Sequence, residues 1–202
     1  MDINAVIKAL ERNRYDKVSF FHTAEDATEY LKEKLVGKVI GFGDSATMEK
    51  MELNKALSEK NTVIDPKPTQ DNDEFLKVAK VCLTTEVFLT SVNAMSEDGI
   101  FVNIDGTGNR VAGSLFGHDQ VYFIISTNKI EENLDKAIWR ARNIAAPKNT
   151  TRYGQKTPCV KTGHCHDCFS PERICNAMCI YYKKMYDLQY CEVVLIDEEM
   201  GF

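Results

Sequence analysis

The chain has 202 residues, of which 44% are hydrophobic and 27% are charged, and its formal net charge is −5. This composition is typical of a soluble globular protein, and a chain of this length can bury a core without disulfide bonds. The acidic balance argues against a dominant role at nucleic acids or membrane surfaces. We therefore expect neither nucleic acid nor membrane among its partners.

The N-terminal sequence MDINAVIKALERNRYD mixes acidic and basic residues and lacks the apolar stretch of a signal peptide. The longest purely apolar run, at residues 121–125, is far too short to span a membrane. We therefore expect a cytoplasmic protein. Thiols stay reduced in that compartment, so clustered cysteines favour metal or redox chemistry over disulfides.

Short apolar runs alternate with helical periodicity along the chain. The runs predict strands at residues 18–21, 38–42, 62–64, 87–91, 100–104, 121–126 and 192–196. Helices are predicted at residues 3–10, 23–35, 53–58, 71–83, 109–116 and 133–145, and from residue 46. This alternation predicts an α/β protein, with a mostly parallel open sheet flanked by helices.

A basic segment lies between the last long helix and the final strand. Residues 147–190 contain seven Lys or Arg and three Asp or Glu, a net charge of +4, so the remaining residues carry −9. The segment also holds five of the seven cysteines. We interpret residues 1–202 as a single domain with a Cys-rich basic insert at about 147–190.

A glycine turn follows the predicted strand at 38–42 and leads into a helix. Glycines allow a ligand to approach the backbone closely, and a helix start offers free N–H groups. Ser and Thr hydroxyls add further donors. The pattern favours a small anionic ligand, although a plain β–α turn explains it equally well, and its residues are Gly41, Gly43, Asp44, Ser45 and Thr47.

The segment 91–113 is rich in small, polar and acidic residues and follows another predicted strand. Ligands of open α/β sheets collect outside the carboxyl ends of the strands. Glu97 is a candidate nucleophile or base, whereas Asp98-Gly99 is more typical of a hairpin turn. The candidate ligand-binding residues of this segment are Asn93, Asn103, Asp105, Gly106, Gly108, Asn109 and Arg110.

Three further basic residues, Lys129, Arg140 and Arg142, lie in the second half of the chain. Lys129 follows a strand end, which places it on the ligand side of the predicted sheet. Arg140 and Arg142 lie on the predicted helix 133–145, and we expect them on its solvated face.

The cysteines of the insert have the spacing Cys159-x5-Cys165-x2-Cys168-x6-Cys175-x3-Cys179. The two-residue gap after Cys165 can direct two thiolates at one metal, and soft thiolates suit zinc or an iron–sulfur cluster. Five cysteines exceed the four that a tetrahedral site needs, and His164 and His166 are alternative ligands. Cys82 and Cys191 are expected in the core.

Several longer runs resemble the lactate-utilisation (LUD) domain family. They are TSVNAMSEDGIFVNIDGTGNRVAG at 90–113, NKI at 128–130, ARNIAAP at 141–147 and VVLIDEEMGF at 193–202. The resemblance implies a fold like that of the ribose-phosphate isomerase, glucosamine-phosphate deaminase and CoA-transferase group. It also implies a role in oxidation of L-lactate or a related organic acid. The spacing in similar sequences implies Cys159, Cys165, Cys168 and Cys175 as the four metal ligands.

The resemblance leaves three interpretations of function open. The first is an accessory or redox component that binds a small anionic or phosphorylated ligand, with iron–sulfur and flavin oxidoreductase subunits as partners. The second is an isomerase or acyl-CoA transferase that uses Glu97, which resembles the Glu of a CoA-transferase Glu-Asn-Gly motif although Asp98 replaces the Asn. The third is a non-catalytic, metal-stabilised scaffold for oxidoreductase subunits. A homo-oligomer is compatible with all three.

Overall fold

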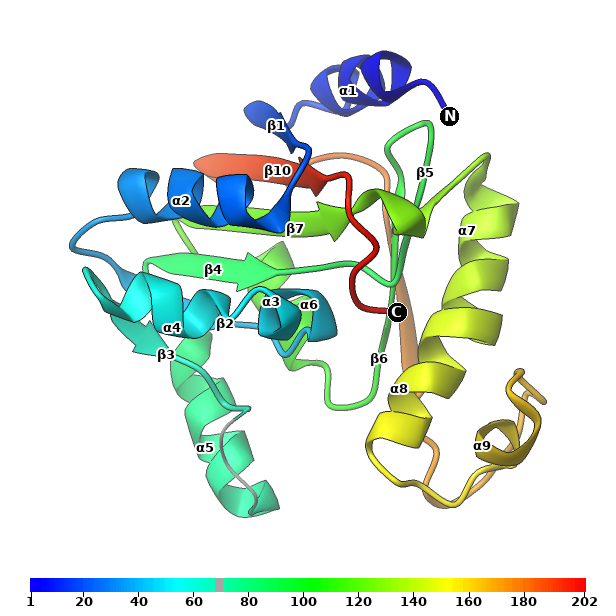
Figure 1. Cartoon of the computed structure of the whole chain (residues 1–202). Helices are drawn as coiled ribbons and strands as arrows, with labels where there is room; N and C mark the ends of the chain where they lie inside the picture. The colour runs from blue at the N-terminus through cyan, green and yellow to red at the C-terminus, as the bar shows by residue number, and fades with distance from the viewer. Residues whose placement is uncertain (68–70) are drawn as a thin grey trace.

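A computed structural model describes residues 1–67 and 71–202 (Figure 1). Its centre is a six-stranded parallel sheet with the strand order β1-β10-β7-β4-β2-β3. The strands are β1 (Lys17–Phe21), β2 (Val39–Phe42), β3 (Thr62–Ile64), β4 (Val87–Thr90), β7 (Gln120–Ser126) and β10 (Tyr190–Ile196). The predicted α/β class and the parallel sheet are therefore confirmed.

Three helices cover one face of this sheet: α2 (Ala24–Lys34), α3 (Ala46–Lys50) and α4 (Leu53–Ser58). Side chains of successive strand residues point to opposite faces, so Tyr122 and Ile124 of β7 pack under these helices. The Thr23 side chain accepts a hydrogen bond from the Asp26 N–H and begins α2, as the sequence predicts. Each helix thus buries an apolar face against one side of the sheet.

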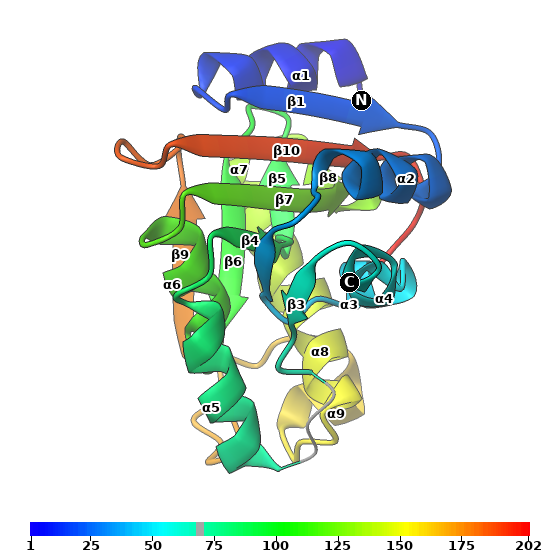
Figure 2. The ribbon, with the colours of Figure 1, turned by 90° about the vertical axis from the view of Figure 1, so that its left-hand side faces the viewer.

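The opposite face of the main sheet is covered by α1 (Ile3–Arg12), α5 (Asn72–Cys82), α6 (Asn109–Leu115) and a second, smaller sheet (Figure 2). The smaller sheet has the order β8-β5-β6-β9. Its strands are β5 (Ala94–Ser96), β6 (Phe101–Asp105), β8 (Ile130–Glu131) and β9 (Ala177–Tyr181). The predicted strand at 100–104 lies in this sheet. The sequence did not predict β5, β8 or β9: β5 and β8 have only three and two residues, and β9 lies in the segment interpreted as an insert.

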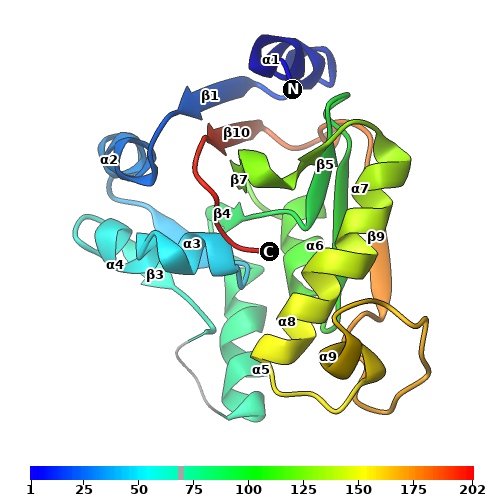
Figure 3. The same ribbon diagram turned by 45° about the vertical axis from the view of Figure 1, so that its right-hand side comes forward.

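A long interrupted helix covers the outer face of the smaller sheet (Figure 3). It consists of α7 (Leu134–Arg140), a π-helical turn (Ala141–Ala145) and α8 (Ala146–Arg152). Pro147 has no backbone N–H and would normally interrupt a helix. Here the wider π-helical turn comes just before it, and the helix continues as α8. The predicted helix at 133–145 is confirmed, but it continues as α8 into the segment predicted as an insert.

The rest of the basic segment forms an excursion and then returns to the domain. The excursion comprises residues 153–176 and contains α9 (Pro158–Thr162), and the chain then enters β9, which pairs antiparallel with β6. Cys82 and Cys191 are buried in the core, as predicted. Among the described residues, no helix is both long and apolar enough to cross a membrane.

The strand order reverses direction between β2 and β4, since β3 lies outside β2 and the later strands lie on the other side of β4. In an open parallel sheet, such a reversal leaves a crevice at the carboxyl ends of the two strands. The loops that start there are 43–45 after β2 and 91–93 after β4. A short 3-10 helix (Thr127–Lys129) follows β7 at the same edge.

A buried carboxylate lies towards the other end of β10. Glu192 is fully buried and accepts hydrogen bonds from Ser19 Oγ, Tyr30 OH and Tyr190 OH, each at 2.7 Å, and pairs with Lys34. Burial by itself raises the pKa of this carboxyl, but these partners outweigh it, and the pKa lies below its usual value.

Glu192→Gln is expected to lower the free energy of unfolding by about 3 kcal/mol at pH 7, because it leaves the Lys34 amine without its buried partner. The folded-state pKa is depressed, so the stabilisation is complete above about pH 5 and is lost as the pH falls through the folded pKa. Urea denaturation at pH 7 and near pH 3 should show the difference between variant and wild type shrinking. Glu86→Gln, which breaks a partly exposed pair with Lys38, should cost less than about 1 kcal/mol.

Candidate functional site

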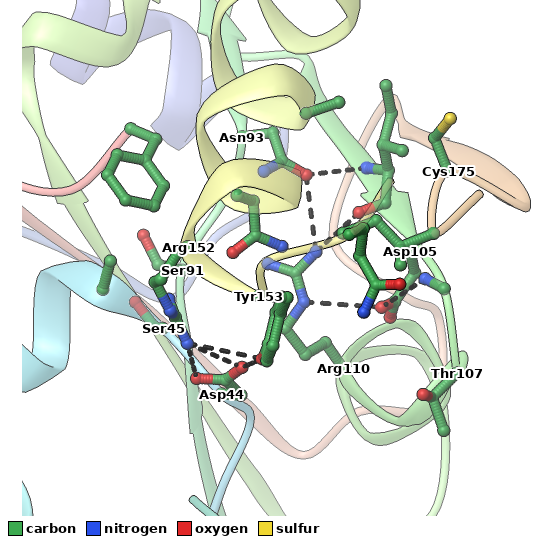
Figure 4. A pocket seen from close by; sticks show the side chains of 18 of the residues that line it. Asp44, Ser45, Ser91, Asn93, Asp105, Thr107, Arg110, Arg152, Tyr153 and Cys175 are labelled. Atoms are coloured by element: carbon green, nitrogen blue, oxygen red, sulfur yellow. Dashed lines mark hydrogen bonds and ion pairs between the residues drawn. The ribbon is translucent and has the colours of Figure 1, made fainter. Parts of the chain in front are cut away.

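A cavity of about 370 Å³ opens at the carboxyl ends of β2 and β4. Figure 4 shows side chains that line it, from the strand-end loops, from the start of α6, from α8 and from the excursion. Seven of the thirteen predicted ligand-binding residues line it: Asp44, Ser45, Asn93, Asp105, Gly106, Arg110 and Lys129. The geometry therefore brings together residues that the sequence separates by up to 85 positions.

Lys129 lies at the cavity with its side chain buried. Its Nζ donates to Thr47 Oγ1 at 2.7 Å and to Ser91 Oγ and the Val92 carbonyl at 3.1 Å. No carboxylate of the described chain lies within ion-pair distance of this amine. Burial, and then the charges of Arg140 and Arg110, lower the pKa of Lys129 to about 7. The amine is thus a buried basic group with a strongly lowered pKa, and no carboxylate among the described residues pairs with it.

The partners of Lys129 suit both protonation states. An ammonium group donates three hydrogen bonds to two hydroxyls and one carbonyl. A neutral amine can donate to the carbonyl and one hydroxyl and accept from the other hydroxyl. The site therefore tolerates a change of charge at Lys129 without a change of partners.

Arg110 reaches the cavity from the first turn of α6. It donates to the Ile104 carbonyl at 2.6 Å, and it lies 3.6 Å from Asp105 (Figure 4). Asp105 also accepts a hydrogen bond from the Val111 N–H and so fixes the start of α6. Asp105 therefore supplies part of the negative charge that faces Arg110.

Arg140 is buried, so the predicted solvated position is wrong. It donates to the Asn93 carbonyl at 2.8 Å and to the Asn128 carbonyl at 3.2 Å, and it lies 3.6 Å from Glu131. The helical spacing did not reveal this role because Arg140 lies on the face of α7 that packs against the loops at the strand ends. Arg142 is partly exposed and pairs with Asp167.

The rim of the cavity carries an ion pair between Arg152 and Asp44. Arg152 Nη2 donates to both carboxylate oxygens of Asp44, at 2.8 and 3.0 Å, and Tyr153 OH also donates to Asp44. Burial raises the pKa of Asp44, but the Arg152 charge and the hydrogen bonds from Tyr153 and Arg152 outweigh it, and the pKa is lowered. This pair ties α8 to the glycine turn.

The other predicted ligand-binding residues support the cavity from outside its lining. Thr47 holds the amine of Lys129, and Asn103 accepts a hydrogen bond from the Asn93 N–H at 3.0 Å. Gly43 lies so close to Phe88, Thr90 and Arg110 that a side chain would meet them within 3.0 to 3.2 Å. Gly41 lies in β2, and Gly108 and Asn109 form the start of α6.

Glu97 lies outside this site. It follows β5, where its N–H donates to the Glu131 carbonyl at 2.8 Å. The predicted Asp98-Gly99 turn is present, with φ +74° at Gly99, and it packs on α1 through Asn13, which donates to the Asp98 carbonyl. The residues that line the cavity do not include Glu97, so the geometry gives its predicted catalytic role no support.

The cysteines of the excursion are all free thiols of intermediate exposure. Arg173 donates to the carbonyls of Cys168 at 2.7 Å and Cys175 at 2.9 Å, which closes the loop between them. Within residues 1–67 and 71–202, no group of three or more His, Cys, Asp or Glu side chains is arranged to hold a metal ion. The four predicted ligands therefore do not form a metal centre in this arrangement.

Sequence reasoning missed several residues of the cavity. Ser91 and Val92 lie in the segment 91–113, but nothing in the spacing marked them as partners of Lys129. Arg152, Tyr153 and Cys175 come from the segment interpreted as an insert. The ARNIAAP run was the one signal that pointed towards α8.

These features define an α/β protein with a ligand cavity at a reversal point of a parallel sheet. The family model of the LUD domain matches residues 3–196. The chain therefore belongs to the LUD domain family, as the sequence resemblance predicts.

A solved structure of a DUF162 family protein from Deinococcus radiodurans resembles this chain with a TM-score of 0.51 and 12% identity, covering 97% of this chain and 99% of that one. Such a likeness shows a shared fold alone. The translation initiation factor eIF-2B of Pyrococcus horikoshii OT3 matches over 55% of this chain and 48% of that one, with a TM-score of 0.38 and 13% identity. No curated protein matches.

The buried amine predicts a pH dependence of stability. Unfolding returns Lys129 to a pKa near 10.4, so between about pH 7 and pH 10 the unfolded chain binds more protons than the folded one. The free energy of unfolding of the wild type should therefore rise over this range by more than that of Lys129→Met. Urea titrations at several pH values measure both, and the exposed control Lys136→Met should follow the wild type.

Proposed function

We propose that this LUD-domain protein binds a small organic anion at Lys129 and acts as an accessory or redox component in the oxidation of L-lactate or a related organic acid. The observation that carries the proposal is the buried amine of Lys129, which has hydroxyl and carbonyl partners but no carboxylate partner within residues 1–67 and 71–202. A buried cation without a counter-ion is costly, and an anionic ligand removes that cost.

The surroundings of Lys129 favour an anion with a modest carbon skeleton. Arg110 and Arg140 add positive charge near the amine, and the Ser45, Ser91 and Asn93 side chains add polar groups. Phe75, Ile104 and Ile174 line other parts of the cavity. The membership of the LUD family supports an organic acid as the ligand, with a phosphorylated compound as the alternative.

Binding can be measured by calorimetry with L-lactate, pyruvate and inorganic phosphate as probes. Lys129→Met should weaken binding of the preferred anion at least about tenfold, because it removes the charge that the ligand pairs with. Lys136→Met removes an exposed lysine and should leave the affinity unchanged. Equal affinity of Lys129→Met and the wild type would exclude Lys129 as the anion site.

The metal assignment rests on the cysteine spacing and on the free thiols of one excursion. We propose that Cys159, Cys165, Cys168 and Cys175 take up zinc or an iron–sulfur cluster after a rearrangement of residues 159–175, since the present arrangement does not gather three of them. Soft thiolate ligands suit both.

Metal analysis and a visible spectrum of anaerobically purified protein test this assignment. A cluster should give a brown protein with absorption near about 400 nm, whereas zinc should give about one colourless metal ion per chain. Cys165→Ser should abolish the metal content, and Cys82→Ser, in the core, should not. A wild type that holds neither metal would contradict the four-cysteine assignment.

A further inference from the structure

Residues 197–202 follow β10 and cross the carboxyl edge of the main sheet, and we call them the strap (Figures 1 and 3). The Met200 N–H donates to Ser126 Oγ at 3.1 Å, and Lys50 Nζ donates to the Glu199 carbonyl at 2.8 Å. The Met200 side chain is buried in the core under α3. The strap is therefore anchored at its middle, next to the short helix that carries Lys129.

Beyond these anchors, the strap reaches the candidate site. Gly201 has φ +66°, and a Cβ there would collide with Thr47 Oγ1 and lie 3.1 Å from Lys129 Nζ. Its backbone thus lies directly against the amine and its closest hydroxyl partner. The next residue, Phe202, lines the cavity.

The contact at Gly201 places the strap over the Lys129 amine. The hydroxyls of Thr47 and Ser91 and the Val92 carbonyl hold the amine from the sheet side, and the backbone of Gly201 covers it. The charged groups near the amine are the Arg110 and Arg140 guanidinium groups, each of which faces a carboxylate, Asp105 and Glu131 respectively. Neither carboxylate pairs with Lys129. The side of the amine that its three hydrogen-bond partners leave open is covered by the backbone of Gly201.

We propose that Gly201 and Phe202 are positioning residues of the anion site. The backbone of Gly201 shields the Lys129 amine and limits the space beside it to a compact carboxylate, while Phe202 meets the carbon chain of the bound acid. The ligand part of this proposal rests on the proposed function, whereas the shielding of Lys129 by the strap does not.

Gly201→Ala tests the shielding, and Gly37→Ala is its matched control. Gly37 has a similar φ of +69°, but a Cβ there has nothing within 4 Å. Both variants carry the same backbone strain, and Gly201→Ala alone pushes the strap away from Thr47 and Lys129. The readout is the pH midpoint of Lys129 acetylation by acetic anhydride, followed by peptide mass spectrometry.

The midpoint should lie near pH 7 in the wild type and in Gly37→Ala, and it should rise by about one unit or more in Gly201→Ala as water reaches the amine. The same midpoint in both glycine variants would overturn the proposal. The result needs no ligand, so it is independent of whether lactate, pyruvate or phosphate binds.

Phe202→Ala covers the case in which Gly201→Ala does not fold. It removes the ring and keeps the backbone, so the midpoint of Lys129 should stay near pH 7 while calorimetric affinity for the preferred acid falls about fivefold. Unchanged affinity would exclude Phe202 from the site. Absence of binding in the wild type, together with a shifted midpoint in Gly201→Ala, would refute the proposed ligand and leave the strap's role standing.

Discussion

The desolvated amine of Lys129 is the constraint on which the candidate site depends. Its partners come from the first turn of α3, which follows the loop after β2, through Thr47, and from the loop after β4, through Ser91 and Val92, while Lys129 itself follows β7. One nitrogen therefore fixes three strand-end loops relative to one another. Because none of its partners is a carboxylate, the contact that orders these loops also leaves an unbalanced charge when the amine is protonated.

Two neighbouring arginines add to the positive charge around Lys129. Arg110 and Arg140 each lie 3.6 Å from a carboxylate and donate to backbone carbonyls, so part of their charge is compensated within the protein. Their charge nevertheless reaches Lys129 and lowers its pKa. At the rim, Asp44 and Arg152 neutralise each other. The unpaired basic group of the cavity among the described residues is therefore Lys129, on the side away from this rim pair.

The sequence predicted the main strands and the loops after them because buried parallel strands are near-continuous apolar runs. Residues such as Asp44, Asn93 and Arg110 could be proposed because polar residues after strand ends fall at one edge of the sheet. The same rule could not separate Ser45, which lines the cavity, from Thr47, which holds Lys129, since both follow the same turn. Arg140 and Glu192 were missed because periodicity shows which face a residue occupies but not which polar groups meet it there.

The Cys-rich excursion differs in composition from the rest of the chain, but it packs directly against the cavity. The Asn176 N–H donates to the Asp105 carbonyl at 3.0 Å, and a Cβ on Gly106 would lie 2.7 Å from the Ile174 carbonyl. Gly106, predicted as a ligand-binding residue, is thus also needed for the close approach of the excursion. Ile174 and Cys175 line the cavity from there.

The Cys-rich excursion and the cavity are therefore in direct contact. Arg173 holds the Cys168 and Cys175 carbonyls together, so a change in the loop between them is passed directly to a residue of the cavity wall. A rearrangement that gathered the other three predicted cysteines around Cys175 would leave this wall in place, whereas one that moved Cys175 towards them would reshape it. Cys175 is thus the cysteine that the excursion shares with the cavity wall, next to the close contact between Gly106 and Ile174.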